Sequence, residues 1–326
     1  MKIIRTAIPL NGFNIDELTQ PFTFNDFDII KNPVFLQREF GFPILVKYLG
    51  LHEFNILVDS ICFYAAIGCP DEICENPMLL SIPAFDKIDI FLTCLWFVKD
   101  NSCNAPNLFS YVLESGVYSF LNSHSLYTTC IGSHVETKFT DEELNRTVEI
   151  VQKLLNIAEN DTFNKSIYTD AIVSIPKNGI HLGIMNQVDY NLRNRIERAF
   201  LFLKSARSSS FILMKISLYM NIYECLFTTD ATEIVHKMAE RVACYYTKDK
   251  SERLLTFRLI KDAYKIRSRY FHGKELEKKT TFTSTPDLLQ RLDNLTRIVL
   301  TKIIIEDSSV FLRKDLEPYF EELIFS

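Results

Sequence analysis

The feature that most constrains this chain is a regular series of helical patterns in its second half. From Asp189 onward, apolar residues recur every three or four positions, which is the spacing of an amphipathic helix. Short turn and capping segments separate these stretches, and short connections between long helices predict an antiparallel helical bundle. Proline is favoured at a first helical position, so Thr285-Pro286-Asp287 marks one helix start. We expect helices at about Tyr190–Ala206, Ser209–Phe227, Ala231–Tyr246, Glu252–Tyr270, from Pro286 onward, and at Val310–Leu323.

The first half of the chain has a mixed pattern. Residues 1 to about 35 are predicted to be extended, and Val117–His134 is ambiguous, with strands as one interpretation. Phe40–Tyr48 and Glu53–Ala66 are predicted to be mostly helical, and Phe85–Val98 is expected to form a buried helix. We therefore predict a mixed α+β arrangement before the bundle.

These patterns divide the chain into two domains. We predict a mostly α fold in which an N-terminal α+β domain over residues 1–180 precedes a helical bundle over residues 189–326. The boundary is placed between about 165 and 188, after a helix whose start is marked by a capping box at Thr140 and Glu143. The N-terminal domain carries no recognisable motif, and we expect it to sense a trigger or to restrain the second domain.

Composition and cysteine spacing exclude several classes of protein. With 47% hydrophobic and 24% charged residues, the chain has the composition of a folded globular protein. No apolar run approaches the roughly 20 residues that span a bilayer, and the N-terminus does not read as a signal peptide. We expect a cytoplasmic protein with reduced thiols. Cys62, Cys69 and Cys74 lack the spacing of a zinc site, and no glycine-rich nucleotide loop is present. We expect no metal and no cofactor.

The charge of the chain is unevenly distributed. The net charge is −5, yet Asp189–Phe282 holds 19 Lys and Arg against 11 Asp and Glu. A basic segment inside an acidic protein can mark a surface for a polyanion such as RNA. Helical surfaces rich in lysine and arginine produce the same excess without any partner, so both interpretations stay open at this point.

The helix expected over Glu252–Tyr270 and the residues just after it contain the candidate catalytic side chains. Arg267 follows Ala263 by four positions and Tyr264 by three, which places it on the inward stripe of the helix. A buried guanidinium needs a partner, and Glu224 in the second helix of the bundle is a candidate. His272 comes five residues later and is followed by Gly273, a natural helix terminator. The two basic side chains are expected to project into one cleft.

An arginine and a histidine are sufficient for metal-free cleavage of RNA. The imidazole can take the proton from a ribose 2′-OH or donate one to the leaving 5′-oxygen. The guanidinium can hold the phosphate and stabilise the charge of the transition state. DNA lacks the 2′-OH nucleophile, so this chemistry selects RNA. A basic residue near a helix C-terminus also complements the helix dipole, and the spacing alone fits that role as well.

Two segments resemble the HEPN domain, specifically its ApeA-like branch. They are Tyr223-Glu224-Cys225-Leu226-Phe227 and the run from Tyr264 to Gly273, Tyr-Lys-Ile-Arg-Ser-Arg-Tyr-Phe-His-Gly. Ala239–Ala243 resembles the helix between them, and the similarity covers about Asp189–Ile305. Tyr223 and Cys225 depart from the family pattern, but both keep an apolar helix face.

The resemblance implies a metal-independent endoribonuclease that leaves a 2′,3′-cyclic phosphate and acts in anti-phage defence, abortive infection or a toxin system. It implies that Arg267 and His272 are catalytic and that Glu224 orients Arg267. The site would be shaped by further residues of the same helix end, Tyr264, Ser268, Arg269 and Gly273.

The resemblance further implies a homodimer whose two motifs face one cleft, RNA (tRNA included) as the substrate, and a phage-derived trigger, with no membrane partner. The alternative is a catalytically inactive HEPN-like module that binds RNA or protein or mediates dimerisation. A metalloenzyme built on the N-terminal cysteines and histidines is a third hypothesis.

Overall fold

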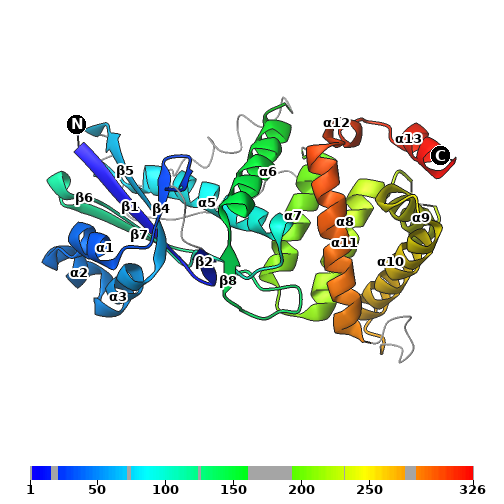
Figure 1. The fold of residues 1–326 in the computed structure, drawn as a ribbon, viewed down its shortest axis with the longest axis horizontal. Coiled ribbons are helices and arrows are strands. Elements are labelled where there is room, and N and C mark those ends of the chain that lie inside the picture. Colours follow the sequence, from blue (N-terminus) through cyan, green and yellow to red (C-terminus); the bar gives the residue numbers. More distant parts are fainter. Residues whose placement is uncertain are drawn as a thin grey trace. The chain divides into compact units, whose positions relative to one another are not determined.

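The computed structural model describes residues 2–15, 21–71, 75–123, 126–160, 193–230, 232–275 and 284–325 (Figure 1). The chain divides into two compact units, which are Met1–Tyr127 with His134–Glu149, and Thr128–Ser133 with Ile150–Ser326. The first, called the α/β unit, is mixed, whereas the described part of the second, called the helical unit, contains helices and no strand. The predicted fold class, mostly helical with a mixed N-terminal region, is therefore confirmed. The boundary predicted between 165 and 188 lies outside the described residues.

The α/β unit is built on a six-stranded antiparallel sheet with the order β3-β4-β5-β1-β6-β7. Strand β1 lies inside the sheet because it pairs with β5 along its whole length and with β6 on its other edge. A separate parallel pair is formed by β2 and β8. The strands are β1 (Lys2–Leu10), β2 (Phe13–Ile15), β3 (Thr23–Phe24), β4 (Phe27–Ile30), β5 (Ile61–Cys69), β6 (Asn107–Val112), β7 (Val117–Asn122) and β8 (Thr137–Phe139).

Helices cover both faces of this sheet (Figure 1). Helices α1 to α3 pack on one face, where Leu36 and Leu57 contact a core that includes Tyr64 of β5. Helix α5 covers the other face, where the ring of Phe91 lies 5.4 Å from that of Phe63. Alternate β5 side chains point to opposite faces, so both faces are apolar. The helices are α1 (Pro33–Phe40), α2 (Pro43–Leu49), α3 (Leu51–Asp59), α5 (Met78–Val98) and α6 (Asp141–Asn160), with a 3-10 turn at Leu113–Ser115.

Two expectations for the α/β unit were wrong. The helix predicted over Glu53–Ala66 ends at Asp59, and Ile61–Cys69 is strand β5. A continuous apolar run fits a buried strand as well as a buried helix, and pairing with β1 decides between them. The thiols were expected to be reduced, yet Cys69 at the end of β5 is disulfide-bonded.

The helical unit has the series of helices predicted from the sequence (Figure 1). Polar side chains cap the N-termini of some of these helices. Asn194 and Glu197 form a capping box at α7, and Ser284 caps α11, which has Pro286 in its first turn. None of the helices in the described ranges combines the length and the apolarity needed to cross a membrane. The helices are α7 (Arg195–Ser208), α8 (Ile212–Phe227), α9 (Ile234–Tyr246), α10 (Lys250–Phe271), α11 (Thr285–Ile305), α12 (Ser308–Phe311) and α13 (Glu317–Phe325).

The last predicted helix is divided into two. Instead of one helix over Val310–Leu323, the chain forms the short α12 and then α13, which starts at Glu317. Pro318 explains the second start, because proline disfavours helical backbone in the preceding residue and is accommodated in a first turn. Phe311 and Phe320 are both buried, so each short helix contributes one aromatic ring to the core.

Candidate functional site

The predicted site residues lie on and beside the C-terminal half of α10. This helix begins after Asp249, whose side chain accepts a hydrogen bond from the Glu252 amide. It packs against α8 and α9 (Figure 1). Its buried stripe recurs every three or four positions and fixes which side of the helix faces the core. That stripe consists of Thr256, Leu259, Ile260, Ala263 and Ile266.

The end of α10 is a defined stop. Gly273 has a φ of +63°, a left-handed conformation that glycine adopts without steric cost. The Lys274 amide donates to the Arg269 carbonyl at 2.9 Å, and the Gly273 amide donates to the Tyr270 carbonyl at 3.1 Å. Backward hydrogen bonds of this kind satisfy the last carbonyls of a helix. They place His272 at the C-cap and expose it to solvent.

Arg267 is held against α8 by two side chains. Its Nη1 donates to Glu224 Oε1 at 2.7 Å, and its Nη2 donates to Glu224 Oε2 at 3.1 Å and to Asn221 Oδ1 at 3.0 Å. The Arg267 and Glu224 side chains are 21% and 27% exposed. A bidentate arginine–carboxylate pair of this type fixes the plane and the direction of the guanidinium. Helix α8 can present Glu224 there because the neighbouring Tyr223 is fully buried and anchors the helix.

The guanidinium of Arg267 keeps little free donor capacity. It has five N–H donors, and Glu224 and Asn221 take three of them. Its Nε is buried and has no hydrogen-bond partner among the described residues. One Nη1 proton is left for a ligand, since the other one binds Glu224. The rings of Tyr264 and Phe271 lie 5.2 Å and 5.9 Å from the guanidinium carbon, so the cation also rests on aromatic faces.

His272 has different surroundings from Arg267. Five residues of α-helix turn through about 500°, which leaves the two positions about 140° apart around the axis. Arg267 faces α8, whereas His272 lies past the last turn and is exposed. Among the described residues, no hydrogen bond or ion pair joins the two side chains. The structure pairs Arg267 with Glu224 and leaves His272 exposed at the end of the helix.

An open basic groove of about 560 Å³ runs along the outer face of α10. Lys261, Lys265 and Arg269 follow one another at intervals of four and form one stripe on the helix surface. His272 comes three positions after Arg269, which continues that stripe. Tyr264, Ser268 and Arg269, all expected to shape the site, line this groove together. Its full lining is Val235, Lys261, Asp262, Tyr264, Lys265, Ser268, Arg269 and Lys274.

A second groove, of about 680 Å³, reaches the Arg267 pair from the α8 side. Asn221 and Glu224, which hold Arg267, form part of its wall together with Arg195 and Arg198 of α7. Arg195 Nη1 donates to the Thr228 carbonyl at 2.7 Å. Burial, and then the charge of Arg198, lower the pKa of Arg195. Arg195 and Arg198 therefore belong to the wall of a groove, although nothing in their local sequence pattern singles them out.

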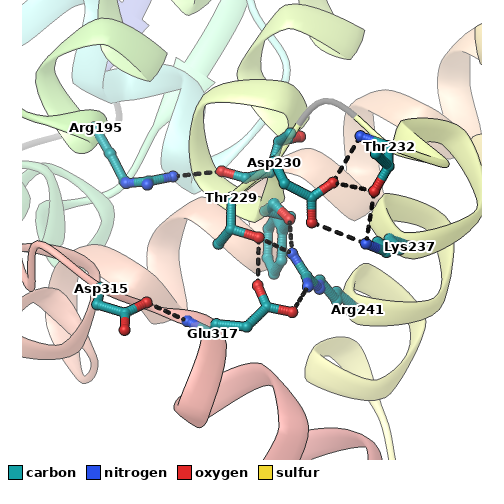
Figure 2. A network of polar contacts seen from close by, with 10 residues as sticks. Arg195, Thr229, Asp230, Thr232, Lys237, Arg241, Asp315 and Glu317 are labelled. Atoms are coloured by element: carbon teal, nitrogen blue, oxygen red, sulfur yellow. Dashed lines mark hydrogen bonds and ion pairs between the residues drawn. The ribbon is translucent and has the colours of Figure 1, made fainter.

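A polar network fixes the loop between α8 and α9 beside this groove (Figure 2). Arg241 of α9 is 4% exposed in its side chain and donates to Glu317 of α13 at 2.6 Å. It also donates to the Phe227 carbonyl at 3.0 Å and to Thr229 Oγ1 at 2.9 Å. Figure 2 shows Thr229 between Arg241 and Glu317, with its hydroxyl donating to the carboxylate. Helix α13 is thereby attached to the end of α8.

Some residues of the two grooves were not predicted from the sequence. Only the basic stripe on α10 has a sequence pattern from which it could have been found. Lys261 and Lys265 were not singled out, although their four-residue spacing with Arg269 was the sign of a continuous basic stripe. Asn221 was not considered because nothing in its local pattern marks it. It lies one turn before Glu224 on α8, and that position becomes informative only once Arg267 is known to face α8.

The cysteines of the α/β unit are core residues where they are described. Cys62 is fully buried, and its thiol donates to the Leu57 carbonyl at a sulfur–oxygen distance of 3.4 Å. Burial raises the pKa of the Cys62 thiol, which opposes the thiolate that metal binding requires. Cys94 and Cys103 are likewise buried, and neither forms a disulfide. Cys74, which with Cys62 and Cys69 was judged to lack the spacing of a zinc site, lies outside the described residues.

Comparison with known proteins adds no family to this geometry. No protein-family model, no characterised protein and no solved structure matches the chain. The resemblance to the HEPN domain rests on the motif residues themselves, from Tyr264 to Gly273 with Glu224 opposite.

Proposed function

We propose that the chain is a metal-independent endoribonuclease and that residues 189–326 form a HEPN domain of the ApeA-like branch. The observation that carries the proposal is the arrangement at the end of α10. Glu224 and Asn221 hold Arg267 in one orientation, His272 is exposed at the C-cap, and a row of cations leads toward that end of the helix. Cations in a row attract the phosphates of a nucleic acid, and an exposed imidazole can transfer protons.

In the proposed reaction His272 acts on the ribose. It removes the proton from the 2′-OH, the 2′-oxygen forms a bond to phosphorus, and the bond from phosphorus to the 5′-oxygen breaks. A water molecule or a second imidazolium supplies the proton that the leaving 5′-oxygen takes. The products are a 2′,3′-cyclic phosphate and a 5′-hydroxyl end. Arg267 offers its remaining Nη1 proton to a phosphate oxygen, with Glu224 as the positioning residue.

We propose a homodimer as the active form. Arg267 and His272 lie about 140° apart around one helix, so a single copy does not present both to one phosphate. Two copies whose α10 ends face each other across a bound RNA strand can present the imidazole of one and the guanidinium of the other to the same phosphate. RNA, tRNA included, is the proposed substrate.

The biological setting proposed from the same resemblance is defence against phage, with the α/β unit sensing a phage-derived trigger. Survival of infected cells that express either the wild type or His272→Ala tests this role. Equal survival with both proteins would speak against it.

A second candidate function is a catalytically silent RNA-binding or dimerisation module. The specific observation in its favour is that Glu224 and Asn221 already engage three of the five N–H donors of Arg267. A guanidinium paired in this way can serve to fasten α10 to α8 and nothing more. The basic groove would then bind RNA without cutting it.

The nature of the cleavage products separates these two functions. The purified full chain is incubated with end-labelled RNA in excess EDTA, and the ends of the products are identified by mass spectrometry. The endoribonuclease yields 2′,3′-cyclic phosphates, and a single 2′-deoxy substitution before the cleaved bond stops cleavage there. RNA that is bound and stays intact identifies the silent module. Cleavage that requires a divalent metal contradicts the proposed mechanism.

A further inference from the structure

Three aromatic rings form a connected row beside His272. Phe211, at the start of α8, lies with its ring centroid 5.7 Å from that of Tyr270, and Tyr270 lies 5.3 Å from Phe271. Two members are unusually open for phenylalanine, since Phe211 is 53% and Phe271 is 58% exposed. Phenylalanine usually lies inside a fold, so two exposed rings joined through a third need an explanation.

Helical spacing places Phe271 on the side of α10 next to the basic groove. It follows Ser268 by three residues and Tyr264 by seven, and both of these line the groove. Residues at these spacings share one face of a helix. On its other side, the ring lies 5.9 Å from the guanidinium carbon of Arg267. Phe271 therefore stands between the cations of the groove and Arg267, immediately before His272 in the chain.

We infer that Phe271, supported by Tyr270 and Phe211, is a stacking platform for one unpaired nucleobase of an RNA strand. The phosphates of that strand would lie along Lys261, Lys265 and Arg269, which are spaced by about 6 Å along the helix. Aromatic rings interleaved with a cationic groove are the usual means of holding single-stranded nucleic acid. The location of the cleaved bond beside this base rests on the proposed function, whereas the binding of the base does not.

Charge decides against a second copy of the chain as the occupant of this platform. The core of a protein–protein interface is depleted in charged residues, whereas Phe271 lies beside Arg267, and Arg269 and Lys274 line the basic groove on the same helix end. Cations at that density suit a polyanion. A double helix keeps both faces of its bases stacked, so the platform predicts that the protein selects RNA with an unpaired nucleotide.

The test uses binding and not cleavage, so that it is independent of catalysis. The full chain carrying His272→Ala is titrated with a short RNA that contains one 2-aminopurine, whose fluorescence reports stacking. Adding Phe271→Ala should weaken binding by about 5- to 150-fold, the loss expected for one base–aromatic stack, and should remove the fluorescence change. Phe271→Trp should restore both. Phe325→Leu, which alters a ring that is 90% exposed on α13, is the matched control and should change neither.

Three outcomes overturn the inference. One is equal RNA affinity with and without Phe271→Ala, and another is equal affinity for the single strand and for its duplex. The third is a dimer that dissociates on Phe271→Ala while the monomer binds RNA as before, which would make the platform an interface between copies. If RNA binding depends on Phe271 as predicted but the wild-type protein does not cleave RNA, the proposed nuclease function is wrong and the stacking platform is still supported.

Discussion

Glu224→Gln is the substitution that tests most sharply whether the Arg267 pair is built as described. Glutamine keeps the shape of the side chain and one acceptor oxygen, but it removes the charge and turns an NH₂ group toward the guanidinium. A hydrogen bond to a charged group contributes roughly 1.5–3 kcal/mol net. The two side chains are only 21% and 27% exposed, so solvent screens the pair little. Loss of one of the two charged hydrogen bonds is therefore expected to lower the free energy of unfolding by about 1.5–3 kcal/mol.

The assay is thermal and urea unfolding of the full chain, followed by circular dichroism. For a unit of this size the expected fall in Tm is roughly 3 to 12 °C, since 1 kcal/mol corresponds to about 2–4 °C. Glu149→Gln on α6 is the matched control: its pair with Arg146 is 42% and 46% exposed and should contribute less than about 0.5 kcal/mol. A loss no larger than that of the control would refute the anchoring role. So would additive effects of Glu224→Gln and Arg267→Gln, because contacting residues should be coupled.

Two further predictions concern the core of each unit. Arg241→Met should destabilise the helical unit by about 3 kcal/mol, because it removes a buried cation and leaves the Glu317 carboxylate without its ion-pair partner. Urea unfolding should show almost no effect of Arg291→Met, whose side chain is 59% exposed. Burial, and then the Glu39 carboxylate, raise the pKa of Tyr64 to about 12. The neutral phenol is thus favoured in the folded state, and its stabilising contribution is complete below about pH 10 and is lost as the pH rises toward 12. Urea titrations over that range should show a smaller loss for Tyr64→Phe, and an unchanged slope would contradict this assignment.

The parts of the fold that the sequence predicted are those that depend on local periodicity. Helices α7 to α11 were expected because each has an apolar stripe, and Pro286 marked the start of α11. The end of α10 was expected from Gly273. Strand β5 was mistaken for helix because a wholly apolar run has no alternation, and its pairing with β1 is decided by residues far away in the chain.

In the candidate site, too, the features set by local helix geometry could be predicted, and those set by packing between distant segments could not. The inward direction of Arg267 and the identity of Glu224 as its candidate partner followed from helix geometry alone, and the structure places the two in contact. The sequence could not give Asn221, which depends on how α8 and α10 pack. The prediction that Arg267 and His272 share one cleft stays a prediction, and a separation of five residues, about 140° around the helix, makes it depend on a second copy.

The central claim is that His272 transfers the proton in metal-free cleavage of RNA. The most direct measurement is the single-turnover rate of cleavage of one RNA in EDTA by the wild type and by His272→Ala, with His52→Ala as the control on another exposed histidine. We expect His272→Ala to lower the rate by about 10²- to 10⁴-fold while it retains the folded structure and RNA binding. We expect His52→Ala to cleave at the wild-type rate. Equal rates for the wild type and His272→Ala would contradict the account.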